Sequence, residues 1–73
     1  MNAAQAAYAA RQAKARQLVE RLSQALDRHA EAASAQPRVW GFAGDLGTVC
    51  ANLIEGLGML GALTDEERAL HEV

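Results

Sequence analysis

The sequence predicts an all-α protein, in which an antiparallel helical hairpin is followed by a short third helix and dimerises into a four-helix bundle. Seventeen of the 73 residues are alanine and only one is proline, a composition that favours helix. Two long segments carry apolar residues at alternating spacings of three and four, which is the pattern of a heptad seam. No stretch alternates apolar and polar residues as a strand does. A chain of this length forms one domain, residues 1–73.

The first helix is predicted at about 3–33. Asn2 is a good N-cap, and Gln5 stands at the third helical position, where it completes a capping box. One face then carries the seam of Ala15, Leu18, Leu22, Ala25, His29 and Ala32. Pro37 ends this helix, because proline disfavours helical backbone in the residue before it.

The second helix is predicted at about 38–61. It could begin at Pro37, because proline suits a first helical residue, or at Asp45, which is the better N-cap. The earlier start is favoured by an uninterrupted seam of Val39, Ala43, Leu46, Cys50, Leu53, Leu57 and Leu60. Gly61 is the predicted end.

A third helix is predicted at about 65–72. Thr64 and Glu67 match the capping-box pattern, with Thr64 as the N-cap. The acids of its first turn suit the positive end of the helix dipole.

The second helix is apolar around more of its circumference than one neighbour can cover. Beside its large apolar residues lie small ones, among them Gly44, Gly47 and Gly58. An ordinary surface helix needs an apolar stripe about 100° wide, and this arc is much wider. Three glycines inside a helix also cost about 2–3 kcal/mol relative to alanine. Packing against a second partner would offset that cost.

We expect this partner to be a second copy of the chain. A chain this short has a marginal core, and Cys50, its only cysteine, cannot form an internal disulfide. The expected dimer interface consists of Trp40, Gly44, Leu46, Gly47, Cys50, Leu53, Ile54, Leu57, Gly58 and Leu60. The alternatives are a monomeric hairpin capped by the third helix, or a membrane span over 46–63. The span is disfavoured by Asn52 and Glu55 at its middle, so we expect no membrane association.

The chain is basic in its first part and acidic in its second, although its formal net charge is only −2. Lys14, Arg21 and Arg28 recur every seven residues, with Arg11 nearby, and form a basic edge on the first helix. Such an edge could contact nucleic acid. More commonly it pairs with acids on a neighbouring helix, as flanking positions of coiled coils do.

Other residues have a structural and a functional interpretation, and the structural one is favoured for each. Trp40 and Phe42 could anchor a partner or close the end of the bundle core. His29 could sense pH at an interface or be hydrogen-bonded near the turn. Cys50 could be a nucleophile but reads as a buried small hydrophobe. No catalytic constellation, metal-ligand spacing or phosphate loop is present, so we expect no enzymatic activity, metal or cofactor.

The expected architecture resembles, only as a helical hairpin that dimerises, plasmid-encoded RNA-modulating proteins such as Rop. No residue role follows from that resemblance. The leading hypothesis is a small, non-enzymatic, cytoplasmic module that self-associates, as an accessory or regulatory protein of a bacterium or mobile element. The alternatives are a Rop-like nucleic-acid-binding regulator that uses the basic edge, and an adaptor or antitoxin-like binder of another protein.

Overall fold

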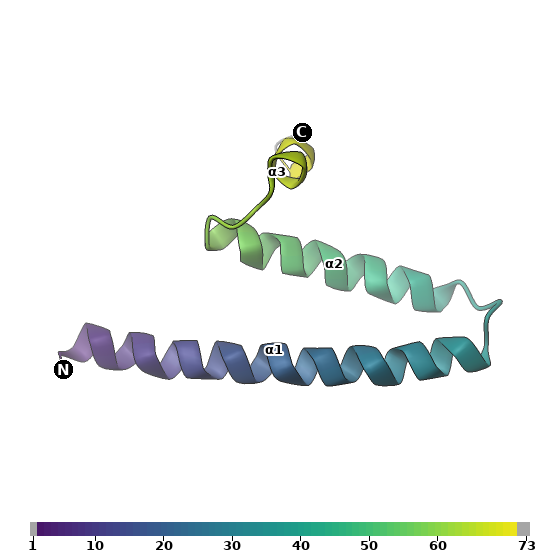
Figure 1. The fold of residues 1–73 in the computed structure, drawn as a ribbon, viewed down its shortest axis with the longest axis horizontal. Coiled ribbons are helices and arrows are strands. Elements are labelled where there is room, and N and C mark those ends of the chain that lie inside the picture. Colours follow the sequence, from purple (N-terminus) through teal and green to yellow (C-terminus); the bar gives the residue numbers. More distant parts are fainter. Residues whose placement is uncertain (1, 72–73) are drawn as a thin grey trace. The chain divides into compact units, whose positions relative to one another are not determined.

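The computed structural model describes residues 2–71, and the regular secondary structure over that range is helical (Figure 1). Helix α1 spans Ala3–Ala35, α2 spans Gly41–Met59 and α3 spans Asp65–His71. The prediction of an all-α protein is therefore confirmed. The chain divides into two units, residues 1–37 and 38–73, which are described separately below.

Helix α1 begins with the predicted capping box. The Gln5 amide donates to Asn2 Oδ1 at 2.8 Å, and the Asn2 amide donates to Gln5 Oε1 at 3.0 Å. At the other end the helix continues to Ala35, and Gln36 is the C-cap. Gln36 has left the helical region (φ −134°, ψ 67°), as expected for the residue that precedes Pro37.

Helix α2 begins at Gly41, between the two starts that the sequence left open. Trp40 is its N-cap residue, and the Trp40 carbonyl accepts from the Gly44 amide at 3.1 Å. The Trp40 side chain makes no capping hydrogen bond, so nothing in the residue types marks this start. Asp45 lies inside the helix instead of capping it. The glycine-containing segment 41–44 is helical, as the seam indicates, although the helix begins three residues later than predicted.

Gly61 terminates α2, as predicted. It has φ +68°, a left-handed conformation that glycine adopts without a side-chain penalty. The Ala62 amide donates to the Leu57 carbonyl at 2.9 Å, and the Gly61 amide donates to the Gly58 carbonyl at 3.1 Å. These two hydrogen bonds define a Schellman motif, which satisfies carbonyls that the helix end would otherwise leave unpaired.

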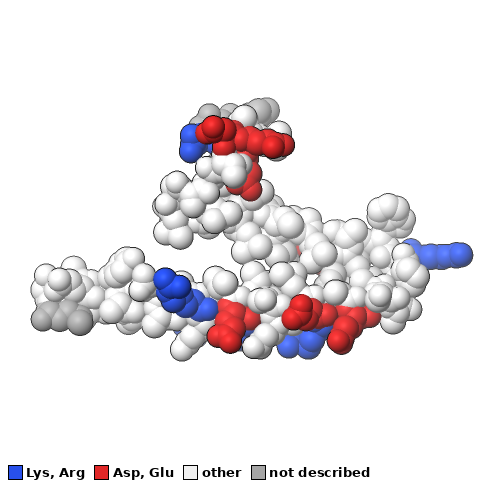
Figure 2. Space-filling view, in the orientation of Figure 1, with Lys and Arg blue, Asp and Glu red and all other residues white. Residues whose placement is uncertain are grey.

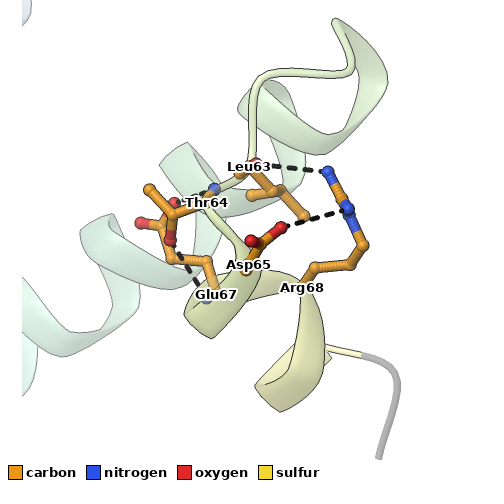
Figure 3. Close-up of polar contacts among 5 residues, drawn as sticks. All are labelled: Leu63, Thr64, Asp65, Glu67 and Arg68. Atoms are coloured by element: carbon orange, nitrogen blue, oxygen red, sulfur yellow. Dashed lines mark hydrogen bonds and ion pairs between the residues drawn. The ribbon is translucent and has the colours of Figure 1, made fainter.

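Helix α3 carries the second predicted capping box (Figure 3). The Glu67 amide donates to Thr64 Oγ1 at 3.1 Å, and the Thr64 amide donates to Glu67 Oε1 at 3.0 Å. Arg68 closes the same turn: its guanidinium lies 3.5 Å from Asp65 Oδ1 and donates to the Leu63 carbonyl at 3.4 Å. This exposed pair contributes little to stability, so the capping box is the main local support of α3.

Candidate interaction surface

Four leucines form a row along α2 that we call the leucine row: Leu46, Leu53, Leu57 and Leu60. With about 100° of rotation per residue, all four fall within an arc of about 60°. Leu46, Leu53 and Leu57 are 37%, 42% and 39% exposed, and Leu60 is 83% exposed. None of the residues from 2 to 70 is buried, so this row is left partly in water.

A strip of small residues, Gly44, Gly47 and Ala51, which we call the glycine flank, lies about 110–170° around α2 from the middle of the leucine row. A Cβ atom added to Gly44 or Gly47 would meet nothing within 4 Å. All three residues are exposed. The backbone of α2 can therefore be approached closely from this side, which side chains prevent on most helices.

Gly58 differs from the other two glycines of the predicted interface. A Cβ atom at Gly58 would lie 3.5 Å from Leu63 Cδ1, because the Leu63 side chain covers this position. Both Gly58 and Leu63 are half-buried. Gly58 therefore already has a partner in its own chain, and periodicity along α2 could not reveal it because Leu63 lies in the following loop.

The remaining residues of the predicted interface are unequally exposed. Trp40 is 87% exposed, so its ring does not plug a core within this chain. Phe42 and Ile54 are half-buried. Cys50 was expected to be buried but is exposed, because the chain buries none of the residues on this face. In the view of Figure 2, the surface of α2 is almost free of charged atoms.

The basic edge belongs to α1. Arg11, Lys14, Arg21 and Arg28 are all exposed, and none forms an ion pair within residues 2–71. Lys14, Arg21 and Arg28 follow one line along the helix, with a drift of about 20° per seven residues. Arg11 lies about 60° from Lys14, toward the apolar face, and does not belong to this line.

Arg21 and Arg28 border a surface depression of about 360 Å³ that lies on α1 alone, together with Leu18, Leu22, Gln24 and Ala25. Gln24 was not among the predicted contact residues. The spacing in the sequence could have identified Gln24, because Gln17 and Gln24 are seven residues apart, as the cations are.

Neither a metal-ligand cluster nor a candidate membrane span is found among the described residues. Within residues 2–71, no group of three or more His, Cys, Asp or Glu side chains could hold a metal ion. His29 is half-buried and has an interaction partner. None of the helices described is long and apolar enough to cross a membrane.

Comparison of the chain with models of protein families, with curated proteins and with solved structures finds no match. The function is therefore argued from the surfaces of this chain: the leucine row with its glycine flank on α2, and the basic edge on α1.

Proposed function

We propose that the protein is a small interaction module that forms a homodimer through α2, with the leucine row and the glycine flank as the contact surface. The observation that carries this proposal is the combination of the two. Helix α2 carries leucines that keep 37–83% of their surface exposed and, about 110° or more around the helix, glycines with open space above the backbone, with the uncharged Ile54 between the two. Exposed apolar rows of this kind mark association surfaces.

The free energy of burying the leucine row is of the size that self-association requires. Full burial of a leucine side chain is worth about 1.5–3 kcal/mol. Scaled by the exposures of the leucine row, completing its burial stabilises a dimer by about 3–6 kcal/mol per copy. Losing the freedom of two independent chains costs about 4–15 kcal/mol. The leucines of two copies therefore balance this cost, and dispersion contacts across the glycine flank supply the surplus.

A second copy suits this surface better than a charged partner does. The arc from Leu60 through Leu53 and Ile54 to Gly44 contains no charged residue. An uncharged surface is complementary to itself, and a two-fold axis places the same surface on both sides of the contact. Large side chains of one copy, such as Ile54, then face the space above glycines of the other.

Sedimentation equilibrium tests this proposal directly. We expect the wild-type chain to be a dimer that dissociates on dilution, and Leu53→Glu to be monomeric because it places a charge in the contact. Met59→Glu is the matched control, since Met59 is 89% exposed and lies about 120° around the helix from Leu53. This control should remain dimeric.

Circular dichroism must show that Leu53→Glu keeps its helical content. If it does not, Gly47→Leu and Asn52→Leu replace the pair. Gly47 belongs to the glycine flank, and a Cβ there meets open space within the chain. Asn52 is exposed and lies at least about 80° around α2 from both the leucine row and the glycine flank. The proposal predicts that only Gly47→Leu dissociates the dimer. A wild-type chain that stays monomeric at millimolar concentration refutes it.

A further inference from the structure

Five side chains of α1 form an uninterrupted donor strip: Lys14, Gln17, Arg21, Gln24 and Arg28. At about 100° per residue, they fall within an arc of about 80°. Successive cations of the strip are about 10.5 Å apart along the helix. The acids Glu20, Asp27 and Glu31 border the strip on one side, about 20–60° around the helix from Gln24 and at least about 60° from Arg21 and Arg28, and none lies within the arc of the strip.

The donors of this strip are unused within the described part of the chain. All five side chains are exposed, and none makes a hydrogen bond or ion pair with residues 2–71. The Arg21, Gln24 and Arg28 side chains border one depression, whose apolar residues are Leu18, Leu22 and Ala25. Two guanidinium groups and an amide therefore lie along one open depression on α1.

Self-association through α2 does not neutralise the strip. In coiled coils, a basic flanking row usually pairs with acids at the flanking positions of the facing helix. On α2 those positions hold Trp40, Gly47 and Ile54 on one side of the seam and Phe42, Val49 and Gly56 on the other. None of them is acidic. The flanking positions of α2 therefore offer no acidic partner for the basic edge.

We propose that the donor strip binds the phosphodiester backbone of a nucleic acid. A straight row of regularly spaced cations matches a regularly charged linear polymer better than it matches a small anion. Arginine, lysine and glutamine side chains are all common donors to phosphate oxygens. The strip is about 21 Å long, which is the rise of about six base pairs. Because the proposed contacts are to phosphates, the binding is expected to be independent of base sequence.

Fluorescence anisotropy with labelled 20-base-pair RNA and DNA duplexes tests this inference between about 50 and 300 mM salt. The test variant is the double substitution Arg21→Ala/Arg28→Ala. The control is Arg16→Ala/Arg38→Ala, which removes the same two charges outside the strip, so that both variants change the formal net charge from −2 to −4. Sedimentation equilibrium of both variants reports separately whether self-association persists.

We expect wild-type binding to weaken steeply with salt, and the test variant to have a slope in log K against log salt that is shallower by about 1.8 per copy. Its affinity at about 100 mM salt should fall tenfold or more. The control, and an Arg21→Lys/Arg28→Lys variant that keeps the charges, should retain most of the slope. Which duplex binds more tightly identifies the natural polymer.

Three results overturn the inference. The first is the absence of wild-type binding at the lowest salt. The second is an equal loss in the test and control variants, which assigns the effect to overall charge. The third is binding to vesicles that contain phosphatidylglycerol but to neither duplex, which assigns the strip to a membrane surface. A monomeric wild-type chain that still binds through the strip refutes the proposed dimer and leaves this inference intact.

Discussion

Gly47→Ala distinguishes a free α2 surface from one that is closely packed, because the two cases predict opposite signs. In the isolated chain, a Cβ atom at Gly47 meets nothing within 4 Å. Alanine in a helix interior is favoured over glycine by about 0.5–1 kcal/mol. A monomer should therefore become more stable on substitution. If the glycine flank is instead packed against a second copy, the added methyl group enters an occupied space.

The same substitution at Gly56 supplies the reference value. Gly56 is also open within 4 Å and lies about 180° around α2 from Gly47, although only about 40° from Leu60, so it gives the reference value for the monomer. Gly56→Ala should raise the unfolding free energy by about 0.5–1 kcal/mol, and the melting temperature by about 2–8 °C for a domain of this size. Overpacking an interface by one methyl group costs about 1–3 kcal/mol. Gly47→Ala should therefore raise the dimer dissociation constant by about 5- to 150-fold.

Sedimentation equilibrium gives the dissociation constants, and thermal unfolding at several protein concentrations gives the stabilities. The expected pattern is a weaker dimer for Gly47→Ala and, at concentrations where the chain is monomeric, a higher melting temperature for Gly56→Ala. If Gly47→Ala is stabilised as much as Gly56→Ala and its dissociation constant does not change, the glycine flank is not in the contact.

Three further predictions concern unit 38–73. Thr64→Ala removes the acceptor of the Glu67 amide and should destabilise α3 by about 0.5–2 kcal/mol. The measurement is amide hydrogen exchange at Glu67, which should become faster; unchanged exchange would contradict the capping role. Gly61→Ala forces a β-carbon into φ +68° and should cost about 1–3 kcal/mol, measured by denaturant unfolding, with a smaller loss for Gly61→Asn. Gly58→Ala should be tolerated, because its Cβ would make ordinary contact with Leu63 at 3.5 Å, whereas Gly58→Leu should displace Leu63 and reduce stability even at concentrations where the chain is monomeric.

Local signals in the sequence were sufficient for most of the helix ends. Both capping boxes and the left-handed Gly61 follow from residue types at fixed spacings, because these interactions join residues only three to five positions apart. The start of α2 is the exception. It depends on the helical backbone of Trp40, with no side-chain cap, so neither Pro37 nor Asp45 marks it.

The surfaces were predictable to a smaller extent. The leucine row and the basic edge follow from helical periodicity, which fixes the angle of each residue around a helix. Periodicity cannot show that a loop residue returns onto a helix, as Leu63 does onto Gly58. The seven-residue spacing of Gln17 and Gln24 was available in the sequence, but only the structure shows that Gln24 borders a depression together with Arg21 and Arg28.

The two long helices differ in intrinsic stability, and this difference is the reason for placing the contact on α2. Helix α1 contains no glycine in 33 residues and is rich in alanine, so its helical propensity is high without any partner. Helix α2 has five glycines in 19 residues and no side-chain N-cap. Its four glycines beyond the first residue cost about 2–4 kcal/mol relative to alanine. A helix that is intrinsically weak is maintained by packing of its apolar face. Because the chain leaves the leucine row partly exposed, the packing that maintains α2 is expected from another molecule, and Gly44 and Gly47 leave open space above the backbone for its approach.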